Sequence, residues 1–147
     1  MGGDISLLHM LRGLGMLGVT VIVQAIFQII LTRALERMPS PRRTRHLGYY
    51  GVVYIVVAVV ILAIGIMTEI NLWAALYYSW GELGSYANAV YFSLASFTTI
   101  GASDLSLSPI HRVVGAQESG VGMLIFGWTT ALLIEVIQST RAAAESA

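Results

Sequence analysis

The chain has 147 residues, of which 56% are hydrophobic and 11% charged, and its formal net charge is zero. Because an average soluble domain carries about 25% charged residues, this composition indicates an integral membrane protein and excludes an ordinary globular enzyme. Cysteine is absent, which excludes disulfides, thiolate metal sites and cysteine nucleophiles. Five of the eight arginines lie between residues 33 and 45, and one basic run beside an apolar segment is more typical of a topology signal than of nucleic-acid binding.

Residues 1–38 are predicted to form an additional amino-terminal transmembrane helix. Its apolar stretch covers residues 14–31, and at 1.5 Å per residue this length just spans a hydrocarbon core of about 30 Å. Gln24 and Gln28 are four residues apart and share one face, which should contact protein rather than lipid. Prolines then end the helix, and residues 39–48 form a basic cytoplasmic loop.

Residues 49–138 are predicted to form a second unit with two further long helices. The first of these begins with the uncharged stretch 49–67, which is too long for a strand, and it should continue to about residue 78. Aromatic side chains near its end are expected to form a belt at the membrane interface: Trp73, Tyr77, Tyr78 and Trp80. The last helix is expected at about 112–138, before a short cytoplasmic tail at 139–147.

The strongest functional signal lies between these two helices. Residues 86–98 are too few to cross a bilayer, so the chain is expected to enter the membrane and return on the same side. The loop that follows, residues 99–104, contains mostly small or hydroxyl-bearing side chains and closes with an acid. Irregular backbone at membrane depth is tolerated only if it is buried in protein or lines a watery path, so this segment indicates a pore.

The arginine run predicts the orientation of the chain. It places residues 39–48 in the cytoplasm, so three crossings put the amino terminus outside and the carboxyl terminus in the cytoplasm. The expected location is the plasma (inner) membrane of a prokaryote. No Ser-His-Asp, paired-carboxylate or phosphate-loop pattern occurs, so nothing supports an enzyme, and no cofactor is expected.

The stretch Ala89-Val-Tyr-Phe-Ser-Leu-Ala-Ser-Phe-Thr-Thr-Ile-Gly resembles the pore helix and first filter half of potassium channels. The resemblance covers residues 49–138 and is closest to small bacterial ion-channel proteins with an extra amino-terminal helix. It implies an all-α membrane protein with three transmembrane helices plus a re-entrant pore helix and filter loop. One copy cannot surround an ion, so a tetrameric potassium-channel-type pore is implied, a homotetramer in contact with membrane lipids.

The resemblance also implies how ions are held. The carbonyls of Thr99, Ile100 and Gly101 and the Thr98 hydroxyl would replace the water shell of K⁺ or another monovalent cation. Alternatively, the two threonines only cap the pore helix. Asp104 is placed at the outer mouth, and its alternatives are a solvated loop acid or a helix N-cap.

The filter departs from the family's Gly-Tyr-Gly-Asp pattern, because Ala102 and Ser103 replace the tyrosine and the second glycine. Ala102 lacks the ring that would wedge the filter against the pore helices. Ser103 costs roughly 1 kcal/mol wherever φ must be positive. We therefore expect cation conduction with reduced potassium selectivity. The alternative is a non-conducting, channel-shaped interaction protein with a collapsed filter.

On the last helix, the resemblance implies a hinge at Gly122. In the main hypothesis, four residues form the cavity wall and inner gate: Phe126, Thr130, Ile134 and Glu135. Four copies of Glu135 would concentrate cations at the inner mouth, unless this residue is simply an exposed acid at a helix end.

Two further acids lie within the long helices, where ionisable groups are expensive and usually partnered. Glu118 is expected to hydrogen-bond to the back of the pore helix, through Ser93 or Ser96. Glu69 is expected to be a structural or interfacial acid rather than an ion ligand.

Overall fold

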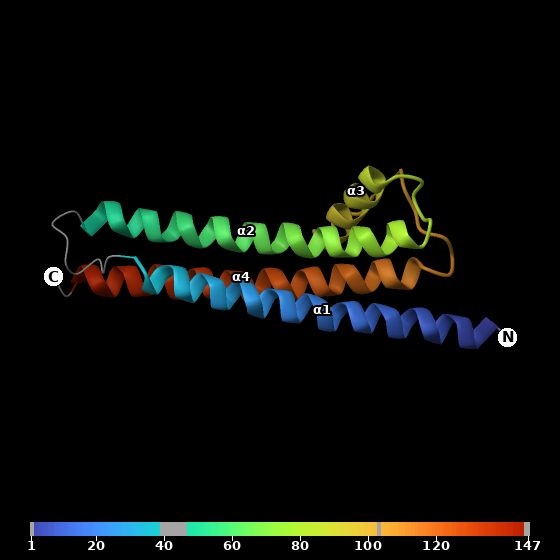
Figure 1. The fold of residues 1–147 in the computed structure, drawn as a ribbon, viewed down its shortest axis with the longest axis horizontal. Helices are drawn as coiled ribbons and strands as arrows, with labels where there is room; N and C mark the ends of the chain where they lie inside the picture. The colour runs from blue at the N-terminus through green and yellow to red at the C-terminus, as the bar shows by residue number, and fades with distance from the viewer. Residues whose placement is uncertain (1, 39–46, 103, 146–147) are drawn as a thin grey trace.

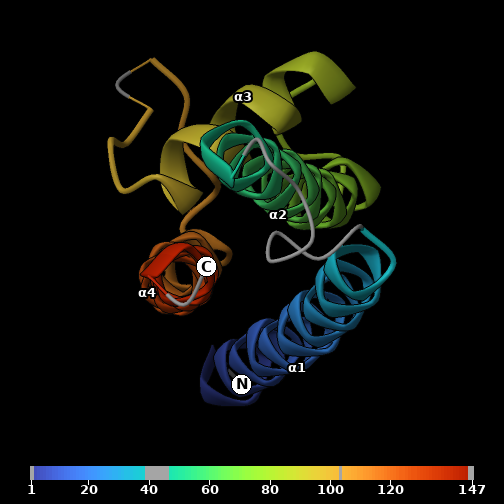
Figure 2. The same ribbon diagram turned by 90° about the vertical axis from the view of Figure 1, so that its left-hand side faces the viewer.

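A computed structural model describes residues 2–38, 47–102 and 104–145. Within these ranges the chain forms four helices and no strand: α1 (Gly2–Glu36), α2 (Leu47–Ser79), α3 (Tyr86–Phe97) and α4 (Arg112–Glu145). The three long helices run along one axis, and α3 packs near one end, on the side of α2 away from α1 (Figures 1 and 2). The predicted all-α fold class is confirmed.

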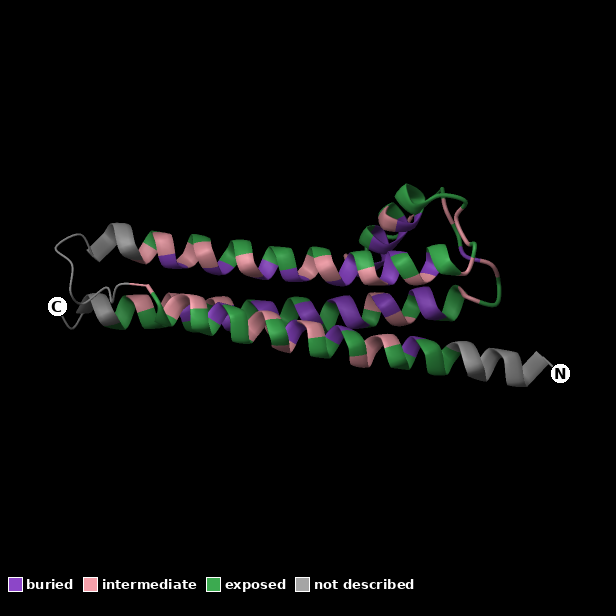
Figure 3. Ribbon diagram, viewed as in Figure 1, coloured by how far each residue is buried: buried purple, intermediate pink, exposed green. Residues whose placement is uncertain are grey.

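Three of the helices in the described residues are long and apolar enough to cross a membrane, at Met10–Glu36, Gly51–Ser79 and Arg112–Ala142. Buried positions lie mainly where the helices face one another, and exposed apolar positions lie on their outer sides (Figure 3). α4 continues past residue 138 to Glu145, because the alanine-rich end of the sequence strongly favours a helix. Most of the predicted basic loop, residues 39–46, lies outside the described residues.

α1 is attached to the other long helices by hydrogen bonds between side chains. The Gln24 amide donates to Thr129 Oγ1 on α4 at 3.1 Å, and the Trp73 indole on α2 donates to Thr20 Oγ1 at 3.1 Å. Near the Gln24 contact, the Trp128 indole donates to Gln28 Oε1, also at 3.1 Å. The prediction that Gln24 and Gln28 face protein is therefore confirmed.

The core has two parts. The smaller joins the long helices away from α3, and its buried members are Leu31, Ala58, Leu62, Leu132 and Val136. The larger surrounds α3, and its buried members are Ile70, Trp73, Ala74, Tyr77, Ala89, Phe92, Phe97, Leu107, Val114, Val121 and Ile125.

The expected aromatic belt is wrong for two of its four residues. Trp73 and Tyr77 are fully buried, whereas Tyr78 is 54% exposed. The reason is that α3 and α4 cover the face of α2 that carries residues 70, 74 and 77, which recur at helical spacing. Trp73 is buried against α1, where its indole donates to Thr20.

The attachment of α1 predicts a measurable coupling between Gln24 and Thr129. Thr129→Val keeps the side-chain shape but removes the acceptor of the buried Gln24 amide. In a double-mutant cycle with Gln24→Leu, we expect a coupling free energy of about 0.6 kcal/mol, and at most about 1.7 kcal/mol. Unfolding in detergent micelles measures it.

Thr130→Val is the matched control, because within the described part of the chain the Thr130 hydroxyl bonds only the Phe126 carbonyl of its own helix. Its coupling to Gln24→Leu should be close to zero. Equal couplings for the two threonines would contradict this attachment of α1.

Candidate functional site

The carboxyl end of α3 turns back sharply into the following loop. Thr98 remains near helical geometry, with φ −81°, but Thr99 has φ 62° and Gly101 has φ 80°. The amides of Thr98, Thr99 and Gly101 donate to the carbonyls of Leu94, Ser96 and Ala95 at 2.9–3.0 Å. A positive φ at a β-branched residue is an outlier that costs roughly 1–2 kcal/mol, and such strain clusters at functional sites.

The carbonyl oxygens of this loop remain open. Within the described residues, no hydrogen bond ends on the carbonyl of Thr98, Thr99, Ile100 or Gly101. Thr99 and Gly101 are exposed, and Ile100 is 82% exposed. The Thr98 hydroxyl donates its hydrogen to the Leu94 carbonyl at 2.7 Å, which leaves its oxygen lone pairs available to a cation.

Two predicted residues close the loop, and a third lies outside the described residues. Ala102 is half-buried and its methyl packs against the core around α3. Asp104 is exposed, and its negative charge raises the pKa of Tyr91. Asp104 is not the N-cap of α4, which begins only at Arg112. Ser103 is the residue that is not described.

Gly122 brings α4 into direct contact with the carboxyl end of α3. A Cβ atom at Gly122 would lie 2.0 Å from the Phe97 carbonyl oxygen, a distance at which backbone must move. The Phe97 ring meets the Phe126 ring edge-on, with centroids 5.8 Å apart. The structure therefore brings together the predicted hinge, one predicted cavity residue and the start of the predicted filter.

The other predicted cavity residues do not all share one face of α4. Thr130 and Ile134 are exposed on the side opposite the buried face. Glu135 is rotated from Ile134 by about 100° around the helix. It borders a groove between α1 and α4 that Glu36 also lines.

A buried polar cluster connects α2, α3 and α4 behind the loop. Glu118 Oε1 lies 2.5 Å from Ser93 Oγ, and Glu118 Oε2 accepts from the Tyr77 hydroxyl at 2.6 Å. Ser93 Oγ also lies 2.8 Å from the carbonyl oxygen of Ile70. The expected contact between Glu118 and the back of α3 is confirmed at Ser93. Tyr77 was missed because its place near the end of a long apolar helix suggested an interfacial aromatic.

Glu69 is a second buried acid. It is fully buried, and neither carboxyl oxygen has a hydrogen-bond partner among the described residues. This full burial supports the structural alternative that was expected for Glu69.

A third polar cluster fixes the segment between α3 and α4. The Ser108 amide donates to Glu82 Oε2 at 3.0 Å, and the Ser108 hydroxyl donates to Glu82 Oε1 at 2.6 Å. His111 Nδ1 lies 2.6 Å from the same oxygen, and its ring stacks on Trp80. Partial burial opposes ionisation of Glu82, but the hydrogen bonds from Ser108 and His111 outweigh it and lower the pKa of Glu82.

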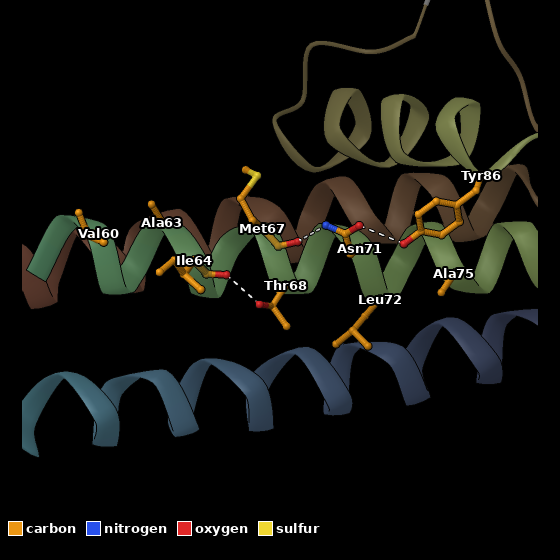
Figure 4. Close-up of a pocket in the computed structure, with 9 residues that line it drawn as sticks. All are labelled: Val60, Ala63, Ile64, Met67, Thr68, Asn71, Leu72, Ala75 and Tyr86. Carbon is orange, nitrogen blue, oxygen red and sulfur yellow. Dashed lines mark hydrogen bonds between the residues drawn. The ribbon is translucent and has the colours of Figure 1, made fainter.

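The outer side of α2 carries a shallow groove of about 720 Å³ that reaches the start of α3 (Figure 4). Its lining is mostly apolar and includes no charged residue. The Tyr86 hydroxyl donates to Asn71 Oδ1 at 3.0 Å, and Asn71 and Thr68 donate to carbonyls of their own helix. This groove therefore suits hydrocarbon rather than ions.

The close approach at Gly122 predicts an unequal response of two glycines. Gly122→Ala should lower the free energy of unfolding by about 1–3 kcal/mol, because its methyl would collide with the backbone of α3. Gly15→Ala, also within a long helix, is the matched control, since a Cβ there meets nothing within 4 Å. Unfolding of both variants in micelles measures the difference, and equal effects would rule out the close contact.

The Glu82 cluster predicts a loss of local structure in acid. A carboxyl whose pKa is lowered in the folded state contributes stability above about pH 4.3, which is lost as the pH falls through its folded pKa. Amide exchange of residues 105–111, corrected for intrinsic rates, should therefore accelerate between pH 6 and pH 3. In Glu82→Gln, exchange should already be fast at pH 6.

Ser108→Ala should weaken this protection, whereas the exposed Ser106→Ala should leave it unchanged. Protection that does not depend on pH or on Glu82 would contradict the account of this cluster.

Comparison with known families adds to this geometry. Residues 49–139 match the model of a family described as Ion channel. A search of curated proteins and a search of solved structures return no match. The matched residues include nearly all of α2, all of α3 and most of α4, which is more than half of the chain. The chain therefore belongs to the ion-channel family, as a multi-pass membrane protein with a pore domain like that of potassium channels.

Proposed function

We propose that four copies of the chain assemble around one axis as a channel for K⁺ or other monovalent cations. Family membership supports ion transport rather than catalysis. The observation that carries the proposal is the open set of carbonyl oxygens at Thr98–Gly101, directly after a helix end at which the carbonyls of residues 94–96 are already bonded. Rings of such oxygens can replace the hydration shell of a cation.

In this proposal α3 is re-entrant. Its 12 residues cover about 18 Å, well short of a core of about 30 Å. The chain enters and leaves α3 at the end of the bundle where α2 ends and α4 begins (Figure 1). The carboxyl end of α3 meets Gly122, which lies about 15 Å along α4 from Arg112. This is close to half the thickness of the core.

The arginines of residues 33–45 orient the assembly. With that segment in the cytoplasm, the amino terminus and the α3 end of the bundle face outside and the carboxyl terminus faces the cytoplasm. The negative end of the α3 dipole then points toward the membrane centre and favours a cation there. We assign the protein to the plasma membrane of a prokaryote, with lipid against the outer face of α2.

A fourfold assembly would supply the ion ligands that a single copy lacks. A single loop supplies too few oxygens to surround an ion, and closed rings of identical subunits are the usual solution. The exposed face of α4 carries small residues, Gly120, Gly127 and Ala131, beside Met123 and Ile134. Small residues allow helices to approach closely, which suits a face between subunits or along a pore better than a lipid-facing side.

Within the pore, Gly122 would permit α4 to bend, in addition to admitting the end of α3. Phe126, Thr130 and Ile134 would narrow the cavity below the filter. Glu135, which borders the groove between α1 and α4, would act on cations at the inner mouth.

The outer part of the filter accounts for the expected selectivity. Ala102 packs only a methyl group behind the loop. Without an aromatic wedge, the diameter of the outer ion sites is less constrained. We therefore expect the channel to discriminate poorly between K⁺ and Na⁺.

The second candidate function is a non-conducting, channel-shaped interaction protein. One observation favours it: the Gly101 amide bonds the Ala95 carbonyl, so the loop folds back on the end of α3. A filter held in that shape by all four copies would not conduct.

Ion flux into liposomes distinguishes the two functions. We expect flux of more than one monovalent cation from the purified protein. The double variant Ala102→Tyr with Ser103→Gly should raise K⁺ flux over Na⁺ flux by about tenfold or more, which corresponds to about 1.4 kcal/mol between the two ions.

Ser106→Gly, an exposed change just beyond the filter, should leave the ratio unaltered. Absence of K⁺, Na⁺ and Rb⁺ flux at every pH would favour the non-conducting protein. If the double variant has the same flux and the same K⁺/Na⁺ ratio as the wild type, residues 102 and 103 are not part of the filter.

A further inference from the structure

The buried cluster at Glu118 has three polar contacts but only two hydroxyl hydrogens, one on Ser93 and one on Tyr77. If Glu118 were ionised, one contact would have no hydrogen. Glu118, Ser93 and Tyr77 are all fully buried, so bulk water does not supply the missing hydrogen-bond donor. Three distances define the cluster: Tyr77 to Glu118 Oε2, Glu118 Oε1 to Ser93 Oγ, and Ser93 Oγ to the Ile70 carbonyl.

Counting hydrogens assigns each of these contacts. The Ile70 carbonyl can only accept, so its contact uses the single hydroxyl hydrogen of Ser93. Ser93 Oγ must then accept from Glu118 Oε1, which requires a proton on that oxygen. Tyr77 donates to Oε2, which is therefore the carbonyl oxygen of a neutral carboxylic acid. All three contacts are hydrogen bonds only if Glu118 is protonated.

Loss of that proton would break the chain at Ser93. A carboxylate at Glu118 cannot donate, so Ser93 would have to turn its hydrogen from Ile70 toward Glu118. One tie of α3, either to α2 or to α4, is lost in each case. The remaining charge would be buried among apolar residues, which is costly without a cation or further donors.

Among the residues that the structure describes, the surroundings of Glu118 offer no compensating charge. Tyr77 from α2 is the titratable side chain that contacts it within the described residues, and Ser93 is the polar contact from α3. The neighbouring residue on α4, Gln117, is uncharged and lies against Gly13 of α1.

We propose that Glu118 is a proton-binding site that controls the channel: α3 stays in its conducting position while Glu118 Oε1 carries a proton, and deprotonation releases it. The control of flux rests on the proposed channel function, whereas the bound proton does not. Ser93 lies four residues before the end of α3, so its release acts on the helix that carries the filter. Flux should therefore fall as the pH rises.

Infrared spectroscopy of the full-length protein in lipid tests the proton directly. The carbonyl stretch of a protonated carboxylic acid is separate from the carboxylate bands, and it should be present near neutral pH and disappear in Glu118→Gln. Glu69→Gln is the matched control, because it alters the other fully buried acid and should leave the Glu118 band in place. In Tyr77→Phe, the band should persist at higher frequency, since Oε2 has lost its donor.

Ion flux as a function of pH tests the control of the channel. Wild-type flux should fall about tenfold or more at alkaline pH, as expected from the loss of one buried hydrogen bond. Glu118→Gln should conduct without this fall, because its amide can donate to Ser93 Oγ and its oxygen can accept from Tyr77. Glu69→Gln should keep the wild-type pH profile.

The outcomes separate this inference from the channel itself. A band that depends on Glu118, with flux that declines in base only when Glu118 is present, would support the proposal. A conducting protein with no Glu118-dependent band, or with the same pH profile in Glu118→Gln, would overturn it and leave the channel intact. If Glu118→Gln does not fold, an unshifted band in Tyr77→Phe would overturn it instead. A Glu118-dependent band in a protein without flux would retain the proton site and overturn its role in conduction.

Discussion

The position of α3 against α2 and α4 is the constraint on which the rest of the structure depends. A helix of 12 residues is too short to be stable alone in water, so its neighbours must hold it. At its middle, Ser93 is bonded to the Ile70 carbonyl and to Glu118. At its end, the missing side chain of Gly122 admits the Phe97 carbonyl into the surface of α4. Together these contacts determine where the loop begins and which carbonyls it presents.

The same constraint explains why α2 and α4 differ from ordinary membrane helices. Each has one face that must match a short helix inserted between them, so buried polar and glycine positions occur where lipid-facing helices carry only apolar residues. Tyr77 serves both purposes: its ring packs edge-on against Phe92 of α3, and its hydroxyl bonds Glu118. α1 is attached differently, by hydrogen bonds of amide and indole groups to α2 and α4. This fits a helix that supports the pore domain from outside the matched family region.

Much of the fold could be predicted from the sequence, because apolar length and helical spacing are local properties. The spans, the short helix at 86–97 and the protein-facing side of Gln24 and Gln28 follow from such local patterns. A partner for Glu118 on α3 was expected at Ser93 or Ser96, because a buried acid requires a partner, and the structure has it at Ser93. The burial of Trp73 depends on which face of α2 the other helices cover, and a one-dimensional pattern does not contain that information.

The candidate site was harder to predict than the fold, since its residues act through contacts between distant segments. Nothing near Gly122 in the sequence indicates that Phe97 lies against it. Likewise, Glu82 before α3 contacts both Ser108 and His111 after it, although the whole of α3 separates them in the sequence. The loop was the part that the sequence predicted least. Thr99 and Gly101 adopt positive φ values that no local pattern indicates. A ring of open carbonyls also requires several copies of the chain, whose arrangement one sequence does not contain.

The central claim is that these carbonyls form ion sites on a fourfold axis. A density map of the assembled protein in lipid, recorded with Rb⁺ or Tl⁺ in place of K⁺, tests it most directly. The account predicts four copies with ion density on the axis at the level of Thr98–Gly101. An assembly without a fourfold axis, or a fourfold assembly whose axis holds no ion at that level, would contradict it.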